Sequence, residues 1–147
     1  MERKEVILDG NLVLDSSVVI KWFSQEKNTE KAINLRERFL KGEVEITVPD
    51  LQLYEIANAL RYNEELKESD VTSAVESLMD IGINIIVPTR EIMSSAIELA
   101  FEFNITLYDA YFLALAKTLR FTFVTADQKL YRKIEELKFV KLLNDLK

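Results

Sequence analysis

The chain has 147 residues, of which 48% are hydrophobic and 30% are charged, a composition that fits one domain with a substantial core. Its formal net charge of −6 argues against sequence-independent nucleic-acid binding through a broad basic face. The absence of Cys and His excludes disulfides, thiolate metal sites and imidazole general bases.

Any metal bound by this chain must therefore be held by oxygen ligands, which suits Mg²⁺ or Mn²⁺. No apolar run reaches the roughly 20 residues of a membrane span, and the charged N-terminus does not have the pattern of a signal peptide. We therefore expect a cytoplasmic protein that does not associate with a membrane.

The first predicted strand is the apolar run 12–14, which ends at Asp15. The preceding run 6–8 is separated from it by an Asp-Gly pair, which can turn a hairpin. We expect instead that this run is an extension packed nearby. A helix is expected to follow Asp15, with Ser16 or Ser17 as its N-cap.

Helical and strand-like patterns alternate through the rest of the chain. Helices are predicted at 28–41, 51–62, 70–79, 90–103, 107–116 and 128–137, and strands at 44–48, 83–87, 120–124 and 139–143. Pro49 suits the first turn of a helix, and Ser69 and Thr106 are expected to be N-caps. The run 83–87 is expected to be a buried parallel strand and 139–143 a short edge strand.

Several apolar residues are expected to face the core. The inner stripe of the helix 28–41 is predicted to be Ala32, Leu35, Phe39 and Leu40. Most aromatic side chains, Phe101 among them, are also expected to be core residues, with a dimer face as the alternative for some of them. The alternation, without a flexible linker or an internal repeat, predicts a single domain over residues 1–147. Its fold class is α/β, a three-layer α/β/α sandwich with a central, mostly parallel sheet.

Four acids are expected at one edge of this sheet. Ligands of such sheets bind beyond the carboxyl ends of the strands, and Asp15 and Asp127 follow predicted strands. Glu55 and Asp109 interrupt apolar helical segments, where a partly buried acid needs a partner. No base lies beside them in the sequence, so a divalent cation would explain a cluster of the four.

Each acid alone also has a simpler explanation. Asp15 and Asp127 suit helix N-caps, Asp109 suits the first turn of a helix, and Glu55 suits a solvent-facing helix position. Asp9 also follows an apolar run, but a Gly turn comes after it, whereas serines and an apolar helix follow Asp15.

Four stretches, taken together, resemble the motifs of PIN domains, and the form most similar is the VapC toxin of prokaryotic toxin–antitoxin pairs. The stretches are residues 13–23, 54–60, 108–116 and 124–127. Each motif alone is weakly specific. All four in order, over nearly the whole chain, are strongly specific.

The resemblance implies a five-stranded parallel sheet with helices on both faces and Mg- or Mn-dependent endoribonuclease activity. It implies RNA as substrate, a VapB-like antitoxin as partner, and a homodimer. It carries four acids over as the catalytic and metal-binding set: Asp15, Glu55, Asp109 and Asp127. Ser16 and Thr125 match positions that order this site in the family, and Asn58 matches a position near it.

Other functions remain open at the level of sequence. The same fold serves RNA-processing or structure-selective nucleases without an antitoxin, and a non-catalytic module would keep the acids to bind an Arg-bearing partner. A phosphoryl-transfer domain is disfavoured because the segment 15–17 lacks a second acid. Four basic residues are candidates for contacts with an RNA backbone, although each is more commonly a solvated charge: Lys21, Arg61, Lys129 and Arg132.

Overall fold

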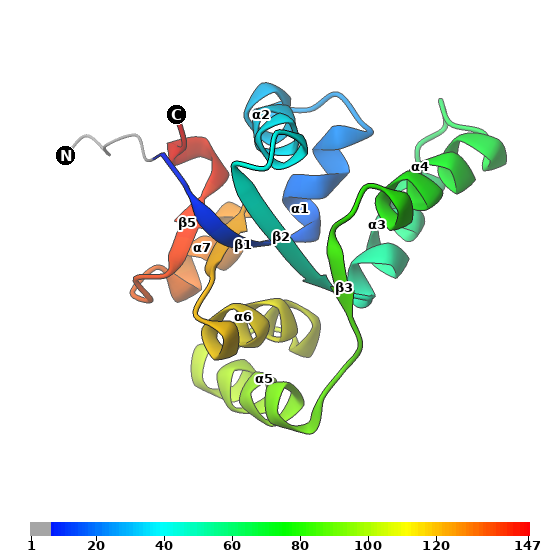
Figure 1. The fold of residues 1–147 in the computed structure, drawn as a ribbon. Coiled ribbons are helices and arrows are strands. Elements are labelled where there is room, and N and C mark those ends of the chain that lie inside the picture. The colour runs from blue at the N-terminus through cyan, green and yellow to red at the C-terminus, as the bar shows by residue number, and fades with distance from the viewer. Residues whose placement is uncertain (1–6) are drawn as a thin grey trace.

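The structure, a computed structural model, describes residues 7–147 and contains one five-stranded parallel sheet with the strand order β3-β2-β1-β4-β5 (Figure 1). The strands are β1 (Gly10–Leu14), β2 (Val44–Pro49), β3 (Asn84–Ile86), β4 (Thr122–Thr125) and β5 (Val140–Leu142). The helices are α1 (Ser16–Val19), η1 (Ile20–Trp22), α2 (Thr29–Leu40), α3 (Leu51–Arg61), α4 (Glu68–Asp80), α5 (Arg90–Phe103), α6 (Leu107–Leu119), α7 (Gln128–Ile134) and η2 (Leu143–Asp145). The predicted three-layer α/β/α fold is confirmed.

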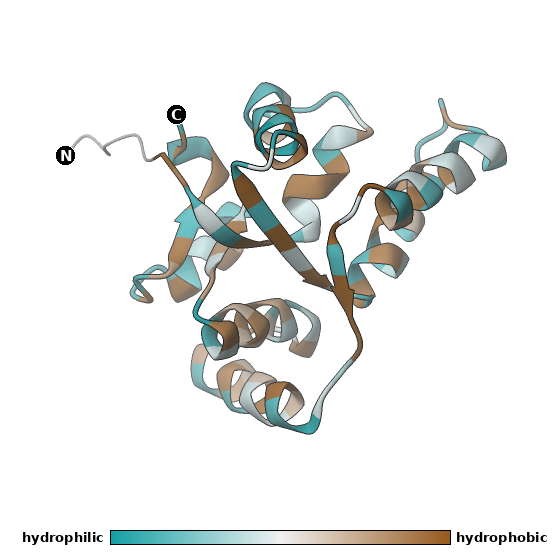
Figure 2. Cartoon of the chain, in the orientation of Figure 1, coloured by the Kyte–Doolittle hydropathy of each residue, from teal (hydrophilic) through white to brown (hydrophobic). Residues whose placement is uncertain are grey.

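Both faces of the sheet are covered, because successive side chains of a strand point to opposite faces. Leu12 and Leu14 of β1 pack into a core with α1, α2, α3 and α4, whereas Val13 packs into a second core with α5, α6 and α7. Apolar residues accordingly dominate the central strands (Figure 2). None of the helices in the described part of the chain is both long and apolar enough to cross a membrane.

Helix α6 lies against the middle of the sheet, where it contacts β1, β2 and β4. Its residues 110–116 are all buried, which is the pattern of a helix enclosed by other elements rather than one lying on the surface. Thr106 is its N-cap, as predicted, and the Thr106 Oγ1 accepts a hydrogen bond from the backbone N–H of Asp109 at 3.1 Å. The local cap therefore sets where α6 begins, and the buried residues that follow hold the helix against the sheet.

Two predicted N-caps and the expected position of one proline differ from the structure, although α3 begins at Leu51 as predicted. Asp15, not a serine, is the N-cap of α1, so that Ser16 and Ser17 lie inside the helix and their hydroxyls are free for other contacts. Pro49 ends β2 instead of opening α3. Ser69 lies inside α4, whose N-cap is Lys67.

The burial of three segments also differs from the prediction. Leu40, in the last turn of α2, is 55% exposed, and Phe101 of α5 is 87% exposed, so neither is a core residue. Strand β3 lies at an edge of the sheet, where Ile85 and Ile86 are half-buried. It is therefore not the fully buried strand that its β-branched composition indicates.

The segment before β1 forms no hairpin within the described residues. Leu8 is buried in the core next to β1, as an extension packed nearby should be, while Ile7 is exposed. Gly10 starts β1 with a φ of 71°, a backbone conformation that glycine adopts without strain. The first residue of the predicted run, Val6, lies outside the described residues.

Candidate metal centre

The candidate site lies beyond the carboxyl ends of β1 and β4, the two neighbouring strands at which the strand order reverses. From β1 the chain builds β2 and β3 on one side, and it later builds β4 and β5 on the other. Such a reversal leaves a crevice at the strand ends, where ligands bind in open α/β sheets. Leu14 pairs with Val124 in the sheet, so the residues that follow them emerge side by side.

Asp15 is the most enclosed acid at this edge, with only 6% of its surface exposed. Its Oδ2 accepts hydrogen bonds from Ser17 Oγ at 2.6 Å and from Thr125 Oγ1 at 2.8 Å. Burial raises the pKa of Asp15, and the charge of Asp127 raises it further, while the two hydroxyls lower it. The hydroxyls orient the carboxylate, but they do not neutralise it.

Glu55 reaches the same region from α3. Its Oε1 accepts a hydrogen bond from Ser16 Oγ at 2.8 Å, which ties α3 to the start of α1. Partial burial raises the pKa of Glu55, and the negative charges of Asp15 and Asp109 raise it further.

Asp109 is half-buried in the first turn of α6. Burial raises its pKa to about 6, and the charges of Asp15 and Asp127 contribute in the same direction. The Thr106 hydroxyl and the positive charge of Lys133 lower it. Lys133 itself is exposed on α7, and its Nζ donates a hydrogen bond to the backbone O of Asn104 at 2.8 Å.

Asp127 is exposed, and its Oδ1 accepts a hydrogen bond from the N–H of Leu130 at 3.1 Å. It is therefore the N-cap of α7, which is the simpler role that the sequence also allowed. Its charge nevertheless acts on Asp15 and Asp109, so it faces the same space while capping the helix.

The four acids thus form one electrostatic group, on which Lys133 acts through its effect on Asp109. Within residues 7–147, none of them takes part in an ion pair. The described side chains do not form a closed cage either, since no three acids have the spacing of a metal site. Mg²⁺ does not require such a cage, because it commonly uses one or two carboxylates and keeps several waters. An all-oxygen donor set around a buried, unpaired carboxylate fits an ion of this kind.

The other predicted site residues differ in their placement. The Ser16 hydroxyl donates a hydrogen bond to the Glu55 carboxylate, and the Thr125 hydroxyl donates one to the Asp15 carboxylate. Asn58 is exposed one helical turn beyond Glu55 and lines a groove between α3 and α4. Lys21, a candidate for RNA contacts, is instead buried with its Nζ 3.6 Å from Glu26 Oε1, so it does not face a ligand.

Three residues near the site were missed in the sequence. Ser17 Oγ bonds Asp15 and also accepts the N–H of Ala126 at 2.9 Å. Gln52 is 1% exposed, and its Nε2 donates to the backbone O of Leu14 at 2.7 Å. For Gln52 the available signal was a polar residue three positions before Glu55 on an otherwise apolar helix. No signal in the sequence identifies Lys133 as a residue near the site.

The fold and the site together define a class of protein: a doubly covered parallel α/β domain with an acidic, oxygen-only centre at its switch point. The PIN domain family model matches residues 12–136, and the chain belongs to that family. The predicted family is therefore confirmed.

Individual relatives agree with this assignment. The chain is 29% identical over 130 residues to ribonuclease VapC3 of Pyrobaculum aerophilum, which covers 86% of this chain and 96% of that protein. Two solved structures share the fold. VapBC2 of Rickettsia felis, bound to a DNA fragment from its promoter, has a TM-score of 0.69 at 18% identity and covers 90% of this chain and 98% of that one. A toxin–antitoxin complex of Klebsiella pneumoniae has a TM-score of 0.64 at 20% identity and covers 90% and 97%.

Proposed function

We propose that this chain is a Mg²⁺- or Mn²⁺-dependent endoribonuclease and the toxin of a VapBC-type toxin–antitoxin pair. The observation that carries the proposal is the group of four acids from separate segments at the switch point of a PIN domain, where burial and the charges of neighbouring acids raise the pKa of Asp15, Glu55 and Asp109. The relative named as a ribonuclease, and neighbours described as toxin–antitoxin complexes, support the same activity.

In this proposal Asp15 and Asp109 hold the ion, and Glu55 and Asp127 complete its surroundings directly or through water. A bound divalent cation acidifies water and offsets the charge that develops on a phosphodiester during hydrolysis. The hydroxyl groups of the chain orient the carboxylates that surround the ion. Ser17 and Thr125 fix the Asp15 carboxylate, Ser16 fixes Glu55, and Thr106 fixes the turn that carries Asp109.

The test uses a panel of tRNA, ribosomal RNA fragments, mRNA and flapped DNA, incubated with the purified protein in Mg²⁺, Mn²⁺ or EDTA. We expect cleavage of RNA that requires the metal and is lost in Asp15→Asn and Asp109→Asn. Asp9→Asn is the matched control, because Asp9 is an exposed aspartate at the opposite end of β1. Cleavage that persists in EDTA or in Asp15→Asn would disprove the proposed centre.

The panel also separates the alternatives. Cleavage of flapped DNA in preference to RNA would indicate a structure-selective nuclease. Metal-dependent cleavage of RNA, combined with growth arrest that a small neighbouring gene product relieves, would support the toxin. A protein that cleaves nothing on the panel would be a binding module.

We further propose that the protein is a homodimer that pairs through α5. Met93, Ile97 and Phe101 form a row at i, i+4 and i+8 along this helix, and Ile97 and Phe101 are 47% and 87% exposed. Met93 also lines an apolar groove of about 200 Å³ together with Leu107 and Tyr108. A continuous apolar surface of this kind marks an interaction site.

A further inference from the structure

A groove of about 680 Å³ between α3 and α4 has no role in the acidic centre, although it begins beside it. Tyr54, Asn58 and Arg61 line it at i, i+4 and i+7, so they share one face of α3. Tyr54 immediately precedes Glu55, and Asn58 lies one turn after it. A ligand chain that leaves the acidic centre along α3 would therefore enter this groove.

The groove combines an exposed aromatic ring with positive charge. Tyr54 is 72% exposed, which leaves its ring open to contact. Lys67 lines the other end of the groove together with one acid, Glu68, so two cations oppose a single carboxylate. The residues that line the groove therefore carry one more positive than negative charge, in a chain whose formal net charge is −6.

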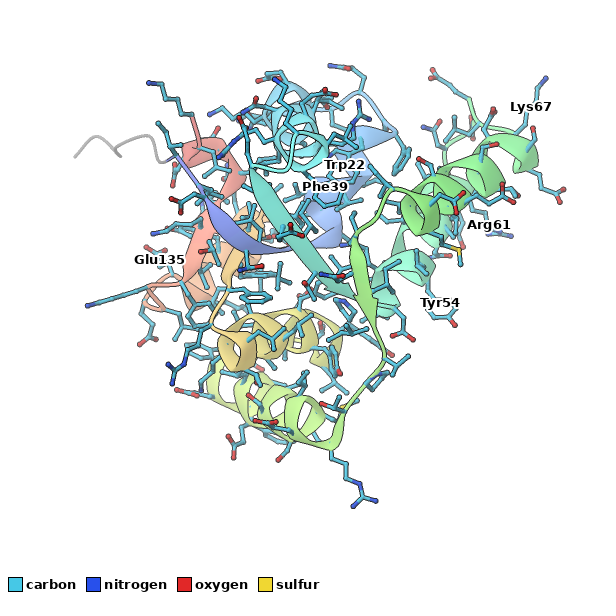
Figure 3. All side chains as sticks on the ribbon, in the orientation of Figure 1. Trp22, Phe39, Tyr54, Arg61, Lys67 and Glu135 are labelled. Atoms are coloured by element: carbon cyan, nitrogen blue, oxygen red, sulfur yellow. The ribbon has the colours of Figure 1, made fainter. Side chains whose placement is uncertain are left out.

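The cations in the groove are available for a ligand. In the part of the chain that the structure describes, neither Arg61 nor Lys67 takes part in an ion pair. The guanidinium of Arg61 lies 5.0 Å from the ring centroid of Tyr62, which holds it in place without neutralising its charge. Figure 3 shows Tyr54, Arg61 and Lys67 following one another along the outer side of the α3–α4 pair.

These features match the chemistry by which proteins bind single-stranded RNA. Unstacked bases pack on aromatic side chains, amide side chains bond their edges, and Arg or Lys contacts the phosphates. Tyr54 and Arg61 are separated by two helical turns, about 10 Å, which is the length of about three stacked nucleotides. The volume of the groove also falls in the range of small-ligand sites.

We propose that the α3–α4 groove binds the single-stranded RNA that flanks the cleaved bond, with Tyr54 stacking on a base and Arg61 and Lys67 contacting phosphates. Asn58 bonds a base edge between them. The inference rests on the proposed ribonuclease function and adds to it the class of substrate, an unpaired strand that extends past the scissile phosphate on the α3 side.

The binding test measures fluorescence anisotropy of a labelled single-stranded RNA pool of about ten nucleotides at several salt concentrations. All variants carry Asp109→Asn to prevent cleavage. Tyr54→Leu is expected to weaken binding about tenfold, and Tyr54→Phe, which keeps the ring, to bind as well as the parent. Arg61→Gln should reduce the slope of log K against log salt by about 0.7, the value for one lost phosphate contact. The control is Lys138→Gln, an exposed lysine at the amino end of β5.

The kinetic test uses the same substitutions in the cleaving protein. Because the groove contacts RNA away from the reacting atoms, Tyr54→Leu should raise KM while leaving kcat unchanged. Active wild type whose RNA binding and KM are insensitive to Tyr54→Leu and Arg61→Gln would overturn the inference and leave the proposed function standing. The inference would equally be overturned if these variants kept RNA binding and lost binding of a peptide or protein antitoxin. Wild type that cleaves no RNA would instead overturn the proposed function.

Discussion

Asp15 shows at the scale of single residues that a buried carboxylate can be recognised from its place after an apolar strand, whereas its partner Thr125 was predicted only through the family resemblance. A charged residue that closes an apolar strand is visible in the sequence. The hydroxyl of Thr125, which bonds it, lies 110 positions away in the chain and becomes a partner only through the pairing of β1 with β4. Ser17 is only two positions from Asp15, but it was expected to be a helix N-cap, and its bond with the N–H of Ala126 bridges 109 positions.

The raised pKa of Asp109 gives a prediction for the metal-free protein. Between pH 4 and 6 the unfolded chain releases this proton, at the ordinary value of 3.8, before the folded protein does at about 6. The free energy of unfolding therefore falls as pH rises through this window and stays lower above it. Asp109→Asn removes this decrease in the free energy of unfolding. In EDTA at pH 7 the variant should therefore be more stable than wild type by about 1 kcal/mol, after allowance for solvent screening.

Urea unfolding of both proteins at pH 4 and pH 7 in EDTA measures this difference, which should be close to zero at the lower pH. In Mg²⁺ the order should reverse, because only wild type gains stability from a bound ion. An Asn variant that is less stable than wild type at pH 7 without metal would show that Asp109 has a structural role.

Gln52 gives a second prediction at the same scale. Its Nε2 joins α3, which carries Glu55, to the last residue of β1, which precedes Asp15. Gln52→Leu removes this donor and leaves the buried carbonyl of Leu14 without it, at a cost of about 1–3 kcal/mol in the free energy of unfolding. Thermal melting measures the change, and Gln25→Leu, at an exposed loop position, is the control. Equal melting temperatures for Gln52→Leu and wild type would contradict the role of this bond.

At the scale of elements, helix starts were predicted less well than helices. The helix 90–103 and the N-cap at Thr106 are confirmed, because Thr89 and Thr106 are both N-caps whose hydroxyls accept a backbone N–H. At α1 the serines looked like caps, but their hydroxyls bond acids of the candidate site instead. A local capping rule fails there because tertiary contacts compete for the same hydroxyl groups.

Burial along helices was predicted from periodicity alone, and it fails where no element covers a face. Leu40 continues the apolar stripe of α2 but lies in its last turn, and Phe101 lies on the face of α5 opposite its buried residues Ile92, Ala96 and Leu99. The hydrophobic pattern therefore predicts which elements pack, but not how far along each one the packing extends.

The cap of α6 gives the prediction at this scale. Thr106→Ala removes the hydroxyl that accepts the N–H of Asp109, and it should reduce the free energy of unfolding by about 1 kcal/mol. Because the same turn carries Asp109, metal affinity should fall as well. Calorimetric titration with Mn²⁺ and thermal melting measure the two effects. Thr106→Ser keeps the hydroxyl and should restore both, so a Ser variant as impaired as Ala would contradict the capping explanation.

At the scale of the whole molecule, the sequence predicted the layers, the parallel sheet and its edge of acids, because alternating elements leave few topologies. The order of the strands in the sheet decides which acids lie close together. The alternation of helices and strands in the sequence does not determine that order. The structure places β1 between β2 and β4, and this placement alone brings Asp15 beside Asp127 and within reach of Glu55.

The proposed dimer gives the prediction at this scale. Phe101→Glu places a charge at the most exposed residue of the apolar α5 row, so sedimentation should show a monomer where wild type sediments as a dimer. Met79→Glu is the control, since Met79 is 59% exposed on α4, away from this surface. Wild type that sediments as a monomer at micromolar concentration would disprove the proposed pairing.

The bond between Thr125 and Asp15 also has a consequence for the order of synthesis. Asp15 and Glu55 leave the ribosome early, whereas Asp109 and the strand that carries Thr125 belong to the last third of the chain. A partly translated chain therefore lacks half of the acids and the hydroxyl that orients Asp15. If the proposed ribonuclease function is right, a chain whose translation stops before β4 should hold no metal ion and cleave no RNA.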